Sequence, residues 1–140
     1  MKNKPSTVLV AILMIIIFIM SSFDSVESSN QSNFIVDIIA NIFKIENIEL
    51  LSFIIRKLAH FTEYLILGLL VANMFIKNNI NNLCLLSIIL CIIYATSDEI
   101  HQIFVPGRAC QLRDILIDSI GSIIGIYLYK LINEKILKNN

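Results

Sequence analysis

The chain has 140 residues, and its 11 basic residues balance its 11 acidic ones. Hydrophobic residues make up 56% of the chain and charged residues only 16%, whereas a soluble domain carries about 25% charged residues. This composition indicates a single integral membrane domain over residues 1–140 and excludes a basic, nucleic-acid-binding protein. The three cysteines follow neither a disulfide framework nor a C-x-x-C metal or redox spacing.

The first predicted element is an apolar helix over residues 5–23, which contain no charged residue. About 20 apolar residues of helix cross the hydrocarbon core of a bilayer, so this segment predicts a membrane span. Lys2 and Lys4 before it, with Ser21-Ser22 after it, also resemble a secretory signal with a cleavage site. We favour an uncleaved helix, because three further spans follow.

Residues 24–57 predict an outer loop that contains one interfacial helix. The stretch 25–33 is polar and rich in Ser and Asn, which predicts irregular structure. Residues 34–55 are mostly apolar, but polar residues recur among them on one stripe at helical spacing: Asp37, Asn41 and Lys44. An amphipathic helix in the membrane interface explains this pattern better than a fifth span, with a tilted or re-entrant helix as the alternative.

Three more spans are predicted over residues 58–76, 83–104 and 115–132. Backbone polar groups in lipid must be satisfied within the segment, so each span is expected to be helical. The short, Asn-rich linker 77–82 makes the second and third spans antiparallel neighbours. The predicted fold is therefore an all-α membrane bundle of four spanning helices plus one amphipathic interfacial helix.

The orientation follows from the flanking lysines. Six lysines lie at the two termini and in the 77–82 linker, and cytoplasmic segments are enriched in Lys and Arg: Lys2, Lys4, Lys77, Lys130, Lys135 and Lys138. We therefore expect a multi-pass protein of the cell membrane with both termini in the cytoplasm.

Ionisable residues gather at the start of the second span, the end of the third and the start of the fourth: His60, Glu63, Asp98, Glu99, His101, Asp114 and Asp118. Because successive spans alternate in direction, these three ends meet on one side of the membrane. Four basic residues reach the same level: Arg56, Lys57, Arg108 and Arg113. The sequence thus predicts a shallow polar pocket at the outer leaflet.

Helical spacing places these side chains on common faces. Arg56, His60, Glu63 and Tyr64 form one stripe, and the third span has another: Tyr94, Asp98, His101 and Gln102. In the fourth span, Gly121 and Gly125 follow the acidic pair and form a small-xxx-small motif, which lets a second helix backbone approach closely.

Three sequence blocks resemble the VanZ-like family. The first is R-K-x-x-H-F-x-E-Y from Arg56, the second is D-E-x-H-Q-x-F-x-P-G-R from Asp98, and the third is D-x-x-x-D/N-x-x-G from Asp114. The resemblance covers residues from about 12 to 130. It implies a small multi-helix membrane protein with a role in the cell envelope, in a family linked to low-level teicoplanin resistance. Asp118 stands where many members have Asn.

Three main hypotheses for the polar cluster stay open. It is an ion-pair network that fixes helix packing, a recognition site, or a catalytic site. For recognition, arginine forks would bind the phosphate or carboxylate of a lipid-linked precursor, a headgroup or a glycopeptide. The candidate ligand-binding residues are Arg56, Tyr64, Glu99, Gln102, Arg108 and Arg113.

For catalysis, the cluster would serve a membrane-embedded hydrolase or transferase acting on a lipid-linked phosphate or ester. A histidine would act as general base beside a carboxylate, and the candidate catalytic residues are His60, Glu63, Asp98, His101, Asp114 and Asp118. A metal version would use the two i, i+3 pairs His60–Glu63 and Asp98–His101 on facing helices. The sequence identifies no cofactor, and ion transport is disfavoured because no ionisable residue lies near a helix midpoint.

Overall fold

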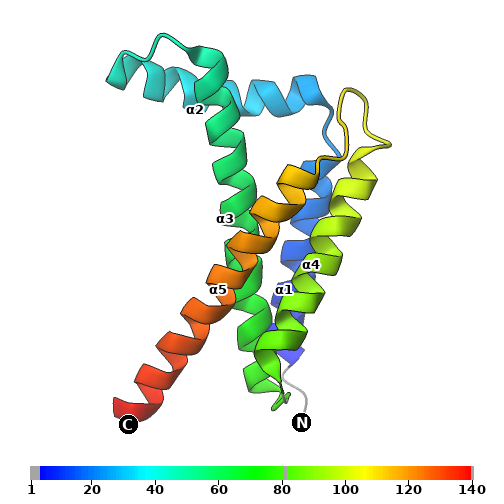
Figure 1. Ribbon diagram of the computed structural model, residues 1–140, viewed down its shortest axis with the longest axis vertical. Coiled ribbons are helices and arrows are strands. Elements are labelled where there is room, and N and C mark those ends of the chain that lie inside the picture. Colours follow the sequence, from blue (N-terminus) through cyan, green and yellow to red (C-terminus); the bar gives the residue numbers. More distant parts are fainter. Residues whose placement is uncertain (1–3, 81, 140) are drawn as a thin grey trace.

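The computed structural model describes residues 4–80 and 82–139, within which five helices and no strand are found (Figure 1). The helices are α1 (Lys4–Ser21), α2 (Ser25–Phe43), α3 (Ile48–Lys77), α4 (Leu83–Gln102) and α5 (Leu112–Asn139). Among them α1, α3, α4 and α5 are long and apolar enough to cross a membrane. The predicted all-α architecture with four spans is therefore confirmed. Lys2, used above for the orientation, lies outside the described residues.

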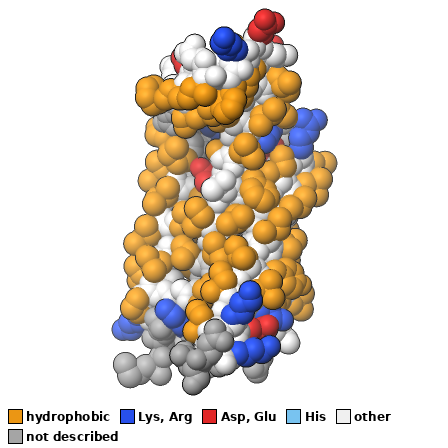
Figure 2. All heavy atoms as spheres, turned by 90° about the vertical axis from the view of Figure 1, so that its left-hand side faces the viewer, with side chains coloured by type: hydrophobic (Ala, Val, Ile, Leu, Met, Phe, Trp, Pro, Cys, Tyr) orange, Lys and Arg blue, Asp and Glu red, His pale blue; other side chains and the backbone are white. Residues whose placement is uncertain are grey.

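The four spanning helices run along the long axis of the molecule, and α2 lies across one end of them (Figure 1). The first residues of α1 lie at the other end near the α3–α4 turn, and the last turns of α5 reach the same end but splay away from the other helices (Figure 1). The polar site described below lies at the α2 end. On the face seen in Figure 2, hydrophobic side chains cover most of the surface and charged side chains concentrate toward its two ends, as expected for a bilayer-spanning bundle.

The predicted small-xxx-small motif is confirmed at the interface of α3 and α5. A Cβ at Gly121 would lie 2.5 Å from the carbonyl oxygen of Phe61, and one at Gly125 would overlap the carbonyl of Leu65. From the α3 side, Gly68 lies equally close to the backbone of Ser122. Only glycine allows these two main chains to touch. The result is a close crossing of α3 and α5, about one turn away from Asp118.

The prediction of irregular structure over residues 25–33 is wrong, because they form the first half of α2. Asp24 caps this helix: one carboxylate oxygen accepts the backbone N–H groups of Val26 and Glu27 at 2.9 and 2.8 Å. A side-chain acceptor at the N-cap satisfies donors that a new helix leaves unpaired. This cap and the packing of α2 against the end of the bundle together outweigh the weak helix propensity of Ser and Asn.

The predicted interfacial helix over residues 34–55 is wrong in its boundaries. Residues 34–43 complete α2, the chain then turns through Lys44 in the left-handed conformation (φ 52°), and residues 48–55 already belong to α3. The side chain of Asn47 starts α3 by accepting the N–H of Leu50 at 3.0 Å. A helix that is not among the candidate spans is present, but it is α2, and α3 begins well before the predicted span.

Candidate functional site

A cavity of about 500 Å³ lies between α2 and the neighbouring ends of the four spanning helices. Every helix contributes to its wall, and so does the loop between α4 and α5. The predicted site residues that line it are Arg56, His60, Glu63, Asp98, Gln102, Arg108 and Asp114. The structure thus brings side chains that are far apart in the sequence to one hollow beneath α2.

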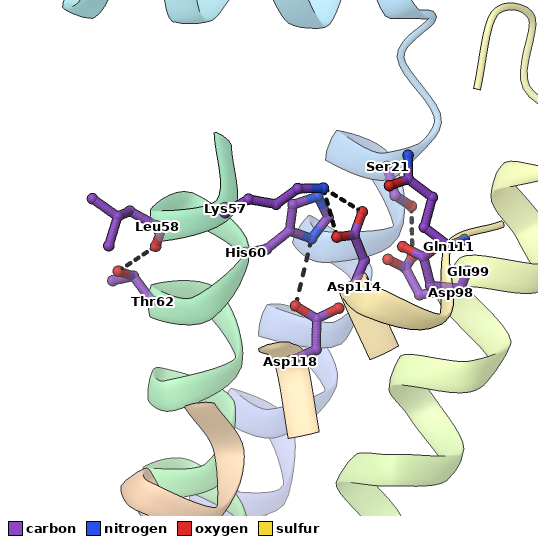
Figure 3. A network of polar contacts seen from close by, with 10 residues as sticks. All are labelled: Ser21, Lys57, Leu58, His60, Thr62, Asp98, Glu99, Gln111, Asp114 and Asp118. Atoms are coloured by element: carbon purple, nitrogen blue, oxygen red, sulfur yellow. Dashed lines mark hydrogen bonds and ion pairs between the residues drawn. The ribbon is translucent and has the colours of Figure 1, made fainter. Parts of the chain in front are cut away.

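Lys57 on α3 and Asp114 on α5 form the shortest ion pair at the cavity. The ammonium nitrogen lies 2.5 and 2.7 Å from the two carboxylate oxygens, and the side chains are 17% and 6% exposed (Figure 3). The candidate ligand-binding residues include Arg56 but not Lys57. One signal was present in the sequence: Lys57 lies seven residues, or about two helical turns, before Tyr64, so the two share a helix face.

His60 and Asp118 form a second pair deeper in the bundle. Nδ1 of His60 lies 3.6 Å from Oδ1 of Asp118, an ion-pair distance longer than a hydrogen bond (Figure 3). Asp118 is fully buried, and neither of its carboxylate oxygens has a hydrogen-bond partner among the described residues. The imidazole is therefore placed between a buried carboxylate and the cavity that His60 lines.

Ser21, at the end of α1, is a site residue that the sequence reasoning missed. Its hydroxyl donates to Oδ1 of Asp98 at 2.6 Å, and both residues line the cavity (Figure 3). The other carboxylate oxygen of Asp98 is buried and has no partner in the described part of the chain. From the sequence, Ser21 is interpreted only as part of a cleavage-site pattern, because no spacing rule relates it to a residue on α4.

Glu99 fixes the loop between α4 and α5. It is fully buried, and its Oε2 accepts the backbone N–H of Gln111 at 2.8 Å. Within this loop Gly107 has φ 73°, which turns the chain so that Arg108 lines the cavity. Burial lowers the pKa of Arg108, while the negative charges of Asp98 and Glu99 act in the opposite direction. Glu99 thus holds in place the loop that forms part of the cavity wall.

Besides Glu99 and Asp118, three more predicted site residues lie outside the cavity wall. His101 faces α1, where its Nε2 lies 3.0 Å from the hydroxyl of Ser22 and its ring lies 4.4 Å from that of Phe18. Arg113 is exposed, with its guanidinium 5.8 Å from the ring of Phe53. Tyr64 is fully buried, with its ring 6.1 Å from that of Tyr94.

The predicted metal set was His60, Glu63, Asp98 and His101. Within residues 4–80 and 82–139, no three His, Cys, Asp or Glu side chains are grouped in a way that could hold a metal ion. The predicted set of four is not assembled, because His101 faces α1 while the other three line the cavity. The geometry gives the metal hypothesis no support.

Comparisons with known proteins give one result. A family model described as VanZ/LLP1 matches residues 6–133, which is nearly the whole chain. Neither the search of curated proteins nor the search of solved structures found a match. The matched range includes nearly all of the four spanning helices and the residues around the cavity. Four membrane-spanning helices, a polar cavity at one end and this match together show that the chain belongs to the VanZ/LLP1 family.

Proposed function

We propose that this membrane protein binds a phosphate or carboxylate group of a cell-envelope component in the cavity beneath α2. One observation carries the proposal: Arg56 and Arg108 line the cavity, and neither forms an ion pair with another described residue. The third cation at the wall, Lys57, is occupied by Asp114. Guanidinium groups bind phosphate and carboxylate through paired, charge-assisted hydrogen bonds.

The positions of the remaining lysines support a cavity on the outer side. Among the described residues, the end opposite α2 carries five of them: Lys4, Lys77, Lys130, Lys135 and Lys138. Outside the cavity wall, the α2 end carries Lys44 and Arg113, together with exposed acidic residues such as Asp37 and Glu46. Because cytoplasmic segments are enriched in Lys and Arg, we assign both termini to the cytoplasm and α2 to the outer surface.

The direct test measures binding of inorganic diphosphate to the detergent-purified protein. Arg56→Ala and Arg108→Ala should each weaken binding at least about tenfold, since a hydrogen bond to a charged group contributes about 1.5–3 kcal/mol. Arg113→Ala is the matched control, because it removes the same charge from the same end of the bundle but not from the cavity wall. Unchanged affinity in both cavity variants would refute the proposal.

In cells, this proposal predicts that the protein contributes to glycopeptide resistance. Cells that express the wild-type protein should tolerate a higher concentration of teicoplanin than cells that express Arg56→Ala in equal amount. An immunoblot of membranes controls for accumulation. Equal teicoplanin tolerance in the two strains, at equal accumulation, would contradict a resistance role for the arginine site.

The His60–Asp118 pair favours a second candidate function, hydrolysis of a lipid-linked phosphate or ester. The buried carboxylate of Asp118 would orient the imidazole, and His60 would take a proton from the attacking water at the cavity. In this version His60→Ala abolishes release of inorganic phosphate from farnesyl diphosphate while diphosphate binding remains. Turnover that persists in the variant, or is absent from the wild type, would refute it.

The alternative of a purely structural ion-pair network is less consistent with the geometry. Such a network needs its charges to be paired with one another. Here the half-buried Arg108 and the exposed Arg56 have no ion-pair partner in the described residues. These free groups line an open cavity, which supports a bound ligand as their partner.

A further inference from the structure

We infer that the ligand is an amphiphile, with an anionic headgroup in the cavity and a hydrocarbon chain that leaves it where α1, α2 and α3 meet. The inference rests on the proposed function and adds the class of ligand. A free anion such as phosphate would need only the basic groups, whereas the wall of this cavity is divided in its chemistry.

One part of the wall is apolar and comes from three helices. It is formed by Met20 at the end of α1, Ile35 on α2, and Ile55 and Ala59 on α3. Arg56 lies on the same stretch of α3, between the last two. A ligand that contacts Arg56 with its anionic group therefore has apolar side chains beside it. Pockets for amphiphilic ligands combine a few fixed polar groups with an apolar lining in this way.

The apolar wall is not closed off from the surroundings. Met20 is 39% exposed and Ile35 is 50% exposed, although both line the cavity. On α2 and α3 further apolar side chains are exposed: Ile38, Ile54 and Leu58. Because α1 and α3 span the membrane, this surface meets lipid. We expect a hydrocarbon chain to leave the cavity past Met20 and Ile35 toward this apolar surface.

The cavity itself is large enough for a headgroup but carries few cations. Its volume of about 500 Å³ lies in the usual range for small-ligand sites, about 300–1,000 Å³. Only Arg56 and Arg108 among the described wall residues are free to meet an anion there, since Lys57 is bound to Asp114. Two guanidinium groups match a phosphate or diphosphate, and the remaining affinity must come from burial of the chain.

The test compares two probes that share an anionic group: inorganic diphosphate and farnesyl diphosphate. Binding is measured on the full-length protein in nanodiscs, with empty nanodiscs subtracted to remove partitioning into lipid. Farnesyl diphosphate should bind at least about tenfold more tightly, since each buried methylene adds about fourfold in affinity. Arg56→Ala and Arg108→Ala should weaken the binding of both probes.

Variants of the apolar wall separate the chain from the headgroup. Ala59→Trp fills the predicted path and should bring the affinity for farnesyl diphosphate down to that for inorganic diphosphate. Ile66→Trp is the matched control, because Ile66 is an exposed residue about two turns further along α3, does not line the cavity and does not belong to the predicted path. Ile35→Asn is a second, milder variant with the same expected direction. Retained binding of inorganic diphosphate shows that each variant is folded.

The outcomes distinguish this inference from the proposed function. Equal affinity for the two probes, with the arginine variants still impaired, would overturn the amphiphile and leave an anion site. The amphiphile is overturned as well if Ala59→Trp and Ile35→Asn leave the preference for farnesyl diphosphate unchanged. Unchanged affinity for both probes in the arginine variants would refute the proposed function itself. A folded wild-type protein that binds neither probe would refute it as well.

Discussion

Removing one partner of the Lys57–Asp114 ion pair should destabilise the protein more than removing both. The ammonium nitrogen contacts both carboxylate oxygens, at 2.5 and 2.7 Å, and the Asp114 side chain is only 6% exposed. In Lys57→Met the carboxylate stays in the bundle without its cation. Breaking a buried pair from one side costs about 3–5 kcal/mol, and we expect the lower end, because the Lys57 side chain keeps 17% of its surface exposed.

The double variant Lys57→Met/Asp114→Leu should recover most of that loss. Replacing both charges by apolar groups of similar size leaves no unpaired charge, so its cost is expected to lie within about 1 kcal/mol of the wild type. Asp114→Leu alone leaves the ammonium unpaired, but this group can reach water, so its cost should lie between the two. The three variants form a double-mutant cycle with a coupling free energy of at least about 3 kcal/mol, which is the sum of the two single losses minus the loss in the double variant.

The assay is reversible unfolding in mixed micelles, followed by circular dichroism as the denaturing detergent is increased. Lys77→Met is the matched control, because it removes an exposed lysine from the opposite end of α3. It should change the unfolding free energy by less than about 0.5 kcal/mol. Additive losses in the double variant would show that the two charges do not interact, and would refute a direct contact between Lys57 and Asp114.

Three further outcomes follow from the structure. Gly125→Val should destabilise the bundle by about 1–3 kcal/mol in the same assay, because its side chain would overlap the α3 backbone; the adjacent, exposed Ile124→Val should not, and equal effects would contradict the close crossing. Tyr94→Phe should cost about 1 kcal/mol, since the hydroxyl donates to a backbone carbonyl of α1 at 2.5 Å; an unchanged unfolding curve would contradict that bond. Exposed Cys110 should react with a membrane-impermeant maleimide in intact cells, whereas Asn79→Cys in a Cys110→Ser background should react only after permeabilisation. The reverse labelling pattern would invert the proposed orientation.

The spanning helices could be predicted from the sequence because each is a long apolar run, and the bilayer leaves such a run few alternatives to a helix. The region before α3 could not, because its pattern is ambiguous. Residues 48–55 continue the apolar run of α3 and residues 34–43 continue α2, yet the two look alike in hydrophobicity. The break between them depends on the backbone at Lys44 and on the cap at Asn47, which are local features without a strong sequence signature.

The grouping of acids and histidines at one end could be anticipated from the alternating direction of the spans. The individual partners could not. His101 shares a helical stripe with Asp98, but it contacts Ser22 and does not line the cavity. Pairs such as Ser21 with Asp98 depend on how two helices are placed relative to each other, and periodicity within one helix carries no information on that placement.

The contact of Gly121 with the backbone of Phe61 has a consequence for genetic screens. Phe61 follows His60 directly, and Asp118 precedes Gly121 by one turn, so the gap between imidazole and carboxylate is set by two main chains that touch. No intervening side chain can absorb a change in that gap. A methyl group added at this crossing would spread the histidine and the acid apart while every polar residue kept its identity. Random mutagenesis screened for inactive alleles should therefore recover glycines in the hydrocarbon zone alongside the charged positions.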